Sequence, residues 1–487
     1  MTATIETECA EQARWRLRPE FRDMMIFDKL VQGEFLPPER QQAVAARRLQ
    51  RLIAFAIAEV PYYRDLFAGH NLSATDIRAP EDLAKLPLLS KVTLMQQGER
   101  LRAEHLPAGE RIFGTFSSSG TTGRPAVVTH TLRSNMMFTA LGQRGVRWNR
   151  WDPLSRVAEI RLPSQLPRRP EGRPVDLGET CDLPFWRYLG RFFQTGDYRS
   201  FSVFNPVDEQ VAWLNQVQPN YLSAYSETLE QLALAARGKP LPETLRGLAA
   251  LSEQLTEGMR RRISEVFGTP ISQNYGLNEA GIVALRCPAG RYHVNSEHCL
   301  VEIVDYEGAL CRAGQSGRIV VTALNNLAMP LIRYDTDDVA EVTEGPCPCG
   351  RTLPSFGNIV GRYSRIAYLP EGTLGYVGAL REALEEMPGD LLRDLRQFQV
   401  HQFRDGRFEL RLRAVAPLGG EVEQRIKAAW KAATEGTDLT LSVVPVKEIQ
   451  RPPSGKYQDF TSDFVPALGE EDEGSVPAPK GAPGGPA

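Results

Sequence analysis

The segment IFGTFSSSGTTGRPAVVTH, residues 112–130, carries the most specific local pattern in the chain. Its centre, SSSGTTGRP (117–125), combines glycines with hydroxyl side chains, and the flanking IFGTF and AVVTH are rich in residues that strands favour. A loop of this composition between two strands can surround an oxyanion with backbone N–H and side-chain O–H groups. It is not a Walker A loop, because the pattern G-x-x-x-x-G-K-[ST] is missing. A flexible Ser/Gly linker is the simpler interpretation, but a linker would not normally join two strands.

Strand-like and helix-like segments alternate on both sides of this loop. CLVEIVD (299–305) and GRIVVTAL (317–324) have the composition of strands, and Thr256–Phe267 is a predicted helix that Gly268 would cap. A further helix is expected to begin at Pro37 and to end at Pro61. Its apolar residues recur at helical spacing: Ala45, Leu49, Leu52, Ile53, Ala56, Ile57 and Val60. The alternation predicts an α/β domain with mainly parallel sheets.

The region after residue 362 has a different pattern. Residues 376–387 and 420–434 are predicted helices, LTLSVVPV (439–446) is a predicted strand, and two strand-like runs flank Asp405-Gly406, a strong hairpin signal. The last stretch, LGEEDEGSVPAPKGAPGGPA, has almost no apolar content. We therefore expect a large N-terminal domain over residues 1–361, beginning with an irregular leader (1–36), a small α+β domain over 362–466, and a disordered tail over 467–487.

Composition excludes several classes of protein. The chain has 487 residues, of which 42% are hydrophobic and 24% charged, and its formal net charge is -3. These values are ordinary for a globular protein and give no strong field for nucleic acid or an anionic membrane. Seven cysteines are too few for a disulfide scaffold, and the N-terminus has no apolar signal segment. We expect a cytoplasmic protein with no nucleic-acid or membrane partner.

Three further segments contain residues suited to nucleotide chemistry. In QNYGLNEAG (273–281), Tyr275 offers a flat ring to a base and Glu279 an oxygen ligand to Mg²⁺. In MPLIRYDTDDVAEV (329–342), Asp338 could accept hydrogen bonds from both hydroxyls of a ribose. In RPPSGKYQDF (451–460), Lys456 is one of only nine lysines and could reach a charge that develops in a transition state. Taken singly, each segment is better interpreted as a surface turn or a solvated loop.

Together and in this order, the four segments resemble the adenylate-forming superfamily of acyl-CoA synthetases, adenylation domains and luciferases. The resemblance is closest to the phenylacetate–CoA ligase family and its capsule-biosynthesis-type relatives. VPYYRDLF (60–67), LPLLSK (86–91), QPNYLSAYSETLEQLA (218–233) and LSEQLT (251–256) also resemble segments of that family. The resemblance implies a large α/β adenylating domain that binds ATP and a carboxylate, followed by a small C-terminal lid domain.

The resemblance also implies roles for individual residues. Glu279 would bind Mg²⁺, and Lys456 would contact the substrate carboxylate and the α-phosphate. The ATP-binding residues would be Ser118, Ser119, Gly120, Thr121, Thr122 and Gly123 at the phosphates, Glu253 and Tyr275 at the adenine, Asp338 with Arg362 at the ribose, and also Asn274 and Gly276.

Several positions depart from the family pattern. Ala126 stands where many members have a lysine, Asn278 replaces the usual Thr or Ser, and Asp337 replaces a glycine. Ser364 occupies the usual place of a hinge aspartate, and IAYLPEGTLGY (366–376) replaces a glycine-containing loop. In the family, that loop helps to form the site of the thioester-forming step. These changes therefore affect the prediction of CoA as the acceptor more than the prediction of adenylation.

Four residues form a candidate metal set: Cys287, His293, Cys347 and Cys349. Three cysteines and one histidine are a typical tetrahedral ligand set for structural zinc. The spacing differs from that of a zinc finger, and the alternative is a group of buried free thiols beside a turn. His298 and Cys299 are reserve ligands, while Cys9, Cys181 and Cys311 are interpreted as ordinary.

Three functions agree with these patterns. The first is ATP-dependent activation of a carboxylic acid, aromatic by family resemblance, to an acyl-adenylate with release of pyrophosphate, followed by transfer to CoA. The second is transfer of the adenylate to an amine or another nitrogen nucleophile. The third is a degenerate nucleotide-binding protein, which the combination of Glu279, Asp338 and Lys456 disfavours.

Overall fold

The structure is a computed structural model that describes residues 30, 32–117, 126–169, 172–251, 255–305, 307–362, 367–369, 372–374, 395–414, 416–434, 439–449 and 460–463. The chain divides into two compact units. One comprises Met1–Leu255 and Met259–Val360, and the other comprises Thr256–Gly258 and Gly361–Ala487.

An eight-stranded sheet forms the centre of the first unit, in the order β13-β9-β8-β7-β6-β5-β3-β4. Parallel pairing joins the strands on one side of it: β4 (Tyr198–Ser202), β3 (Val157–Arg161), β5 (Tyr221–Tyr225), β6 (Gly247–Leu251) and β7 (Ile271–Leu277). Antiparallel pairing joins β7 to β8 (Gly281–Arg286), β9 (Tyr292–Val294) and β13 (Ser355–Phe356).

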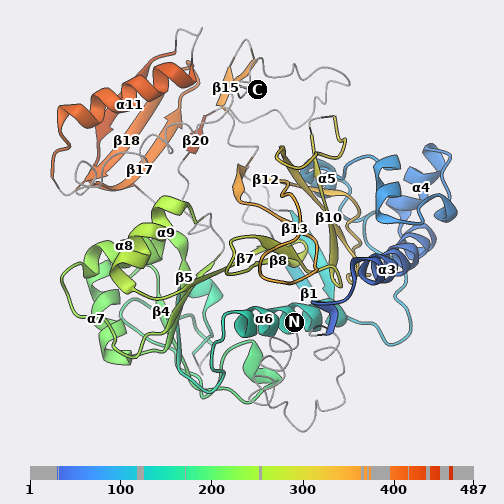
Figure 1. Cartoon of the computed structure of the whole chain (residues 1–487), viewed down its shortest axis with the longest axis horizontal. Coiled ribbons are helices and arrows are strands. Elements are labelled where there is room, and N and C mark those ends of the chain that lie inside the picture. Colours follow the sequence, from blue (N-terminus) through green and yellow to red (C-terminus); the bar gives the residue numbers. More distant parts are fainter. Residues whose placement is uncertain are drawn as a thin grey trace. The chain divides into compact units, whose positions relative to one another are not determined.

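Helices cover both faces of this sheet (Figure 1). One face is covered by α7 (Val207–Val217), α8 (Ser226–Ala236) and α9 (Glu257–Phe267), and the other by α6 (Leu132–Trp148). Side chains of β3 alternate between these faces: Ala158 and Ile160 pack with the first three helices, and Val157 packs with α6. The helix predicted over 256–267 is confirmed as α9, and Gly268 follows it with a φ of +61°.

A second, four-stranded sheet has the order β10-β11-β12-β14. It is formed by β10 (Cys299–Val304), β11 (Ser316–Ala323), β12 (Tyr334–Glu341) and β14 (Ile359–Arg362). The predicted strands at 299–305 and 317–324 are confirmed as β10 and β11, but they pair antiparallel. The expectation of mainly parallel sheets is therefore wrong. Parallel neighbours need a crossover of a dozen or more residues, and connections such as 278–280 are too short for one.

N-terminal helices and a hairpin complete this unit. The apolar face predicted after Pro37 belongs to α3 (Pro38–Glu59), and Pro61 begins a second helix, α4 (Pro61–Gly69). The two strands expected around the glycine-rich loop are confirmed as β1 (Ile112–Ser117) and β2 (Val127–Thr131), which pair antiparallel. The remaining elements are α5 (Lys91–Gln96) and the short 3-10 helices Ala74–Asp76, Pro80–Lys85, Pro163–Gln165 and Leu189–Arg191.

The second unit contains a four-stranded sheet in the order β19-β18-β17-β20. The predicted hairpin is confirmed: β17 (Leu395–Gln402) pairs antiparallel with β18 (Phe408–Ala414), and Gly406 between them has a φ of +84°. Val400, Phe408 and Leu410 form a core with α11 (Gly420–Ala433). β19 (Leu441–Pro445), β20 (Phe460–Ser462) and a small hairpin of β15 (Ala367–Leu369) and β16 (Gly372–Leu374) are the other strands. The helix expected over 376–387 lies outside the described residues.

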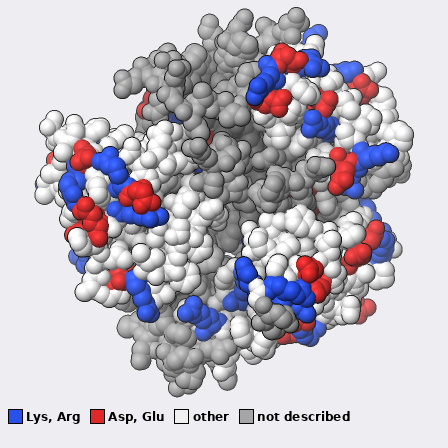
Figure 2. Space-filling view, turned by 180° about the vertical axis from the view of Figure 1, so that it is seen from behind, with Lys and Arg blue, Asp and Glu red and all other residues white. Residues whose placement is uncertain are grey.

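The described surface carries mixed charge. Figure 2 shows Lys and Arg side chains interspersed with Asp and Glu on the face seen there, which agrees with the formal net charge of -3. Among the described residues, none of the helices has both the length and the apolarity that a membrane span requires.

Candidate functional site

The turn Asn278–Ala280, which joins β7 to β8, holds the carboxylate of Glu279. Glu279 is buried, and the phenol of Tyr334 on β12 donates to its Oε1 over 3.4 Å. Burial and the nearby Glu279 raise the pKa of Tyr334, so its hydroxyl keeps the proton that it donates. Within the described part of the chain, Oε2 of Glu279 has no hydrogen-bond partner. A buried carboxylate with one unused oxygen suits Mg²⁺, which takes one or two protein carboxylates together with substrate phosphates.

A second carboxylate, Asp338, lies on the same strand as Tyr334 and is also buried. The hydroxyl of Tyr275 lies 2.9 Å from Asp338 Oδ2 and 3.1 Å from Thr336 Oγ1. Thr336 donates its own proton to the carbonyl of Ile319 over 2.8 Å, so Tyr275 is the donor in both contacts. Of its two acceptors, the Asp338 carboxylate is the nearer and, being charged, the stronger. Tyr275 therefore fixes the direction of the Asp338 carboxylate.

Tyr275 was expected to offer its ring to a base. Its ring is buried and packs edge-on against Phe356, with the ring centroids 6.2 Å apart. The contact that the sequence did not predict is the one from the hydroxyl to Asp338. Asn274 and Gly276 flank Tyr275 on β7, so β7, its turn and β12 bring five of the predicted residues together: Asn274, Tyr275, Gly276, Glu279 and Asp338.

Two departures from the family pattern have a structural counterpart. The carboxamide of Asn278 donates to the carbonyl of Ser117 over 3.0 Å, which ties the turn to the end of β1 where the glycine-rich loop begins. Asp337 has a φ of +65°, in the left-handed region that favours glycine. Its N–H donates to Asp335 Oδ1 over 3.0 Å, and short polar residues such as aspartate tolerate this conformation better than most.

The other predicted site residues lie outside the described residues: Ser118, Ser119, Gly120, Thr121, Thr122, Gly123, Glu253 and Lys456. Arg362 belongs to β14, but its side chain is not described. The hinge position Ser364 is also outside, while the loop after it contributes β15 and β16.

The predicted metal set is brought together in the first unit. The ligand atoms of Cys287, His293, Cys347 and Cys349 all lie within 4.8 Å of one another. Cys287 Sγ is 3.6 Å from Cys347 Sγ, and Cys349 Sγ is 3.3 Å from His293 Nε2. A tetrahedral zinc ion with Zn–S bonds of about 2.3 Å separates its sulfurs by about 3.8 Å, so the set fits zinc.

The surroundings orient the histidine of this cluster. His293 Nδ1 lies 3.1 Å from the carbonyl of Leu353, which can only accept, so Nε2 carries the lone pair and faces Cys349. A hydrogen bond from the Cys287 thiol is the largest influence on the pKa of Cys349 and lowers it. The reserve ligands lie elsewhere: His298 Nε2 bonds the carbonyl of Ala280, and Cys299 Sγ bonds that of Val283 over 3.6 Å.

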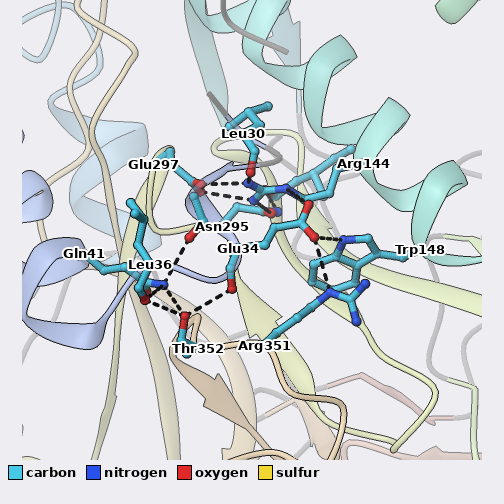
Figure 3. A network of polar contacts seen from close by, with 12 residues as sticks. Leu30, Glu34, Leu36, Gln41, Arg144, Trp148, Asn295, Glu297, Arg351 and Thr352 are labelled. Atoms are coloured by element: carbon cyan, nitrogen blue, oxygen red, sulfur yellow. Dashed lines mark hydrogen bonds and ion pairs between the residues drawn. The ribbon is translucent and has the colours of Figure 1, made fainter. Parts of the chain in front are cut away.

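Figure 3 shows a buried polar network, which meets the cluster where the ring of Trp148 packs edge-on against that of His293, with the centroids 5.8 Å apart. Its centre is Glu34, whose carboxylate meets Arg144 at 3.1 Å, Trp148 Nε1 at 2.8 Å and Arg351 at 3.4 Å. The backbone N–H of Thr352 donates to the carbonyl of Glu34 over 3.1 Å. Residues 1–36 were expected to form an irregular leader. The structure describes Leu30 and residues 32–36 of this segment, and these contacts bind them to α6 and to the CPCGRT segment (347–352).

Known proteins with similar sequences are ligases. A phenylacetate-coenzyme A ligase of Thermus thermophilus is 29% identical over 349 residues, which cover 68% of this chain and 72% of that protein. A phenylacetate-coenzyme A ligase of Pseudomonas putida is 25% identical over 389 residues, covering 75% and 80%. No family model matches the chain. The chain is a distant homologue of the phenylacetate-coenzyme A ligases.

Solved structures of adenylate-forming ligases share the fold of this homologue. A 2-hydroxyisobutyryl-CoA ligase in the postadenylation state has a TM-score of 0.69 at 17% identity, over 89% of this chain and 91% of that one. An anthranilate CoA ligase in complex with anthranoyl-AMP has a TM-score of 0.50 at 16% identity, over 73% and 67%. The predicted α/β class and the superfamily are thereby confirmed, as is the prediction of an AMP-forming ligase. The capsule-biosynthesis-type branch stays a prediction.

Proposed function

We propose that the protein activates a carboxylic acid with ATP as an acyl-adenylate and then transfers the acyl group to CoA. In the first step a carboxylate oxygen forms a bond to the α-phosphorus while the bond from that phosphorus to pyrophosphate breaks, and pyrophosphate leaves with the bonding electrons. In the second step the CoA sulfur, having lost its proton to solvent, attacks the acyl carbon and AMP leaves. The relatives, named phenylacetate-coenzyme A ligases, favour an aromatic acid.

One observation carries this proposal: the turn after β7 holds Glu279, while β12 carries both Tyr334, which donates to Glu279, and Asp338, which Tyr275 of β7 orients. Asp338 would accept from the ribose hydroxyls, and Tyr275 would keep its carboxylate turned toward them. Glu279 would hold Mg²⁺, which reduces the repulsion between the acid and the phosphates. A degenerate nucleotide-binding protein would have no need of this mutual orientation.

The glycine-rich loop (118–123), Glu253, Arg362 and Lys456 complete the proposed ATP site by resemblance alone. Lys456 would contact the carboxylate and the α-phosphate as negative charge develops there. Lys456→Ala is therefore expected to lower pyrophosphate release about 10²–10³-fold. ATP binding, measured by calorimetry, should persist in this variant, and near-normal release would contradict the assigned role.

A second candidate function differs from the first in the molecule that accepts the acyl group. CoA has the support of the relatives' names. An amine or another nitrogen nucleophile has the support of Ser364 and of the altered loop 366–376, since an amine needs no tunnel for the pantetheine arm. We place CoA first.

The deciding experiment is a panel of aryl, arylacetic and aliphatic acids with ATP and Mg²⁺, in which pyrophosphate release is measured with and without CoA. Glu279→Gln is the inactive control. Acid-dependent release in the wild type supports the proposal, and its absence across the panel contradicts it. Mass spectrometry then separates the acceptors: a thioester formed as fast as the adenylate supports CoA, whereas an adenylate consumed only by an added amine supports the alternative.

A zinc ion on Cys287, His293, Cys347 and Cys349 is the second part of the proposal. The four protein ligands would fill a tetrahedral shell and leave no open position, so this ion would be structural. It would tie β8 and β9 to the CPCGR segment.

A further inference from the structure

Two histidines from distant parts of the chain donate to the turn that carries Glu279. His130 on β2 has Nε2 3.0 Å from the carbonyl oxygen of Asn278. His298, just before β10, has Nε2 within hydrogen-bonding distance of the carbonyl oxygen of Ala280. These carbonyls belong to the residues directly before and after Glu279. A carbonyl can only accept, so both imidazoles carry a proton on Nε2.

The second ring nitrogens keep both histidines in this tautomer. His130 Nδ1 lies 3.0 Å from Ser134 Oγ, whose hydroxyl can donate to it. His298 Nδ1 is buried and has no hydrogen-bond partner among the described residues, so a proton there would be unsatisfied. Burial lowers the pKa of both histidines, that of His298 to about 4, which keeps them neutral near pH 7.

The backbone beside the turn is shaped to admit one of these rings. Gly281, which follows the turn, has a φ of +77°. A Cβ at this position would lie 3.2 Å from His298 Nε2 and 3.7 Å from its Cε1. Because glycine has no side chain, His298 can approach the carbonyl of Ala280 without a steric clash.

We infer that His130 and His298 are positioning residues, whose Nε2–H groups hold the turn so that the carboxylate of Glu279 points to the Mg²⁺ of the ATP complex. This inference rests on the proposed function. The one hydrogen bond to the Glu279 carboxylate in the described structure is that from Tyr334, at 3.4 Å, which is too long to fix its direction alone. Its direction therefore depends on the backbone of residues 278–280, and the histidines hold that backbone on both sides.

The affinity of the protein for the metal distinguishes a positioning role of the two histidines from a general contribution to folding. Mn²⁺ replaces Mg²⁺ in the experiment, and electron paramagnetic resonance measures free Mn²⁺ in the presence of ATP and the full-length protein. His130→Leu and His298→Leu remove the donors, and we expect each to weaken Mn²⁺ binding to the ATP complex by about 10-fold or more, as changes in outer-shell partners typically do. His130→Gln and His298→Gln keep an N–H donor and should restore affinity to within about 3-fold of the wild type.

Cys299→Ala is the matched control, because it removes a buried side chain next to His298 that does not contact the turn. It should lower the melting temperature and leave Mn²⁺ affinity unchanged. Folded leucine variants that bind Mn²⁺ as the wild type does would overturn the inference, and so would glutamine variants as weak as the leucine ones. Glu279→Gln shows separately whether the proposed site is real: a wild type whose Mn²⁺ affinity does not depend on Glu279 overturns both the proposed function and the positioning role.

Discussion

Glu34 and Arg144 form an ion pair in which both side chains are fully excluded from solvent, with Arg144 Nε 3.1 Å from Glu34 Oε1. The guanidinium also reaches Glu297 Oε1 at 2.7 Å and Asn295 Oδ1 at 2.8 Å, so its positive charge faces two carboxylates. Together with these two contacts, the pair connects three parts of the chain that are far apart in sequence: the N-terminal segment, α6 and the stretch before β10 (Figure 3).

Glu34→Gln is expected to destabilise the first unit strongly. The change removes one member of a buried charge pair and leaves Arg144 less compensated, which typically costs about 3–5 kcal/mol. The measurement is the apparent free energy of unfolding from urea denaturation. The control is Glu104→Gln, which breaks an ion pair with Arg64 whose two side chains are about half exposed, at 47% and 46%. That control should leave stability unchanged, and an equal loss in both variants would contradict the assigned importance of burial.

Tyr275→Phe tests the orientation of Asp338. The variant keeps the ring and removes the hydroxyl, and a hydrogen bond to a charged group contributes about 1.5–3 kcal/mol. We expect ATP affinity, measured by calorimetry, to fall at least about tenfold, since Asp338 loses the donor that orients it. The control is Tyr198→Phe, which removes the hydroxyl that donates to Glu159 on the neighbouring strand β3. Reduced stability with unchanged ATP affinity is expected there, and equal ATP affinities in the two variants would refute the role of Tyr275.

Asp337 offers a test of backbone strain in the β12 segment. Its φ of +65° is unfavourable for residues with a Cβ by roughly 1–2 kcal/mol, least so for aspartate and asparagine. Asp337→Gly should be tolerated within about 1 kcal/mol, while Asp337→Val should lower stability by more, because a β-branched side chain is least compatible with this conformation. Thermal denaturation of both variants decides the point. A valine variant as stable as the glycine variant would show that the residue is not held in the left-handed region.

The elements that the sequence predicted well depend on local chemistry. Gly268 after α9, Asp405-Gly406 in the hairpin and the strands around the glycine-rich loop are each specified within a few residues. Strand direction was mispredicted for β10 and β11, because it depends on connection length and on pairing between distant segments.

In the candidate site, too, the sequence indicated the residue types but not the contacts between distant segments. Residue type singled out Glu279, Asp338 and the Cys/His set as candidates, since few kinds of side chain bind a metal ion or a ribose hydroxyl. The contacts that hold them were not predictable, because they join residues such as His130 and Asn278 that lie 148 positions apart. Glu34 in particular looks like an ordinary charged residue of a polar leader until its partners on α6 are known.

The last prediction concerns zinc. Protein expressed with zinc supplied should contain about one zinc ion per chain by elemental analysis. Cys347→Ser should lose it and should also lower the melting temperature, because the ion would replace thiol contacts between β8, β9 and the CPCGR segment with metal–ligand bonds. Cys181→Ser is the control, since this buried thiol bonds the carbonyl of Arg168 and lies outside the cluster. Because the four ligands leave no open coordination position, a chelator should reduce stability before it changes the acid-dependent release of pyrophosphate. A fully stable wild type that stays free of metal after expression with zinc would contradict the assignment and would favour a cluster of buried thiols instead.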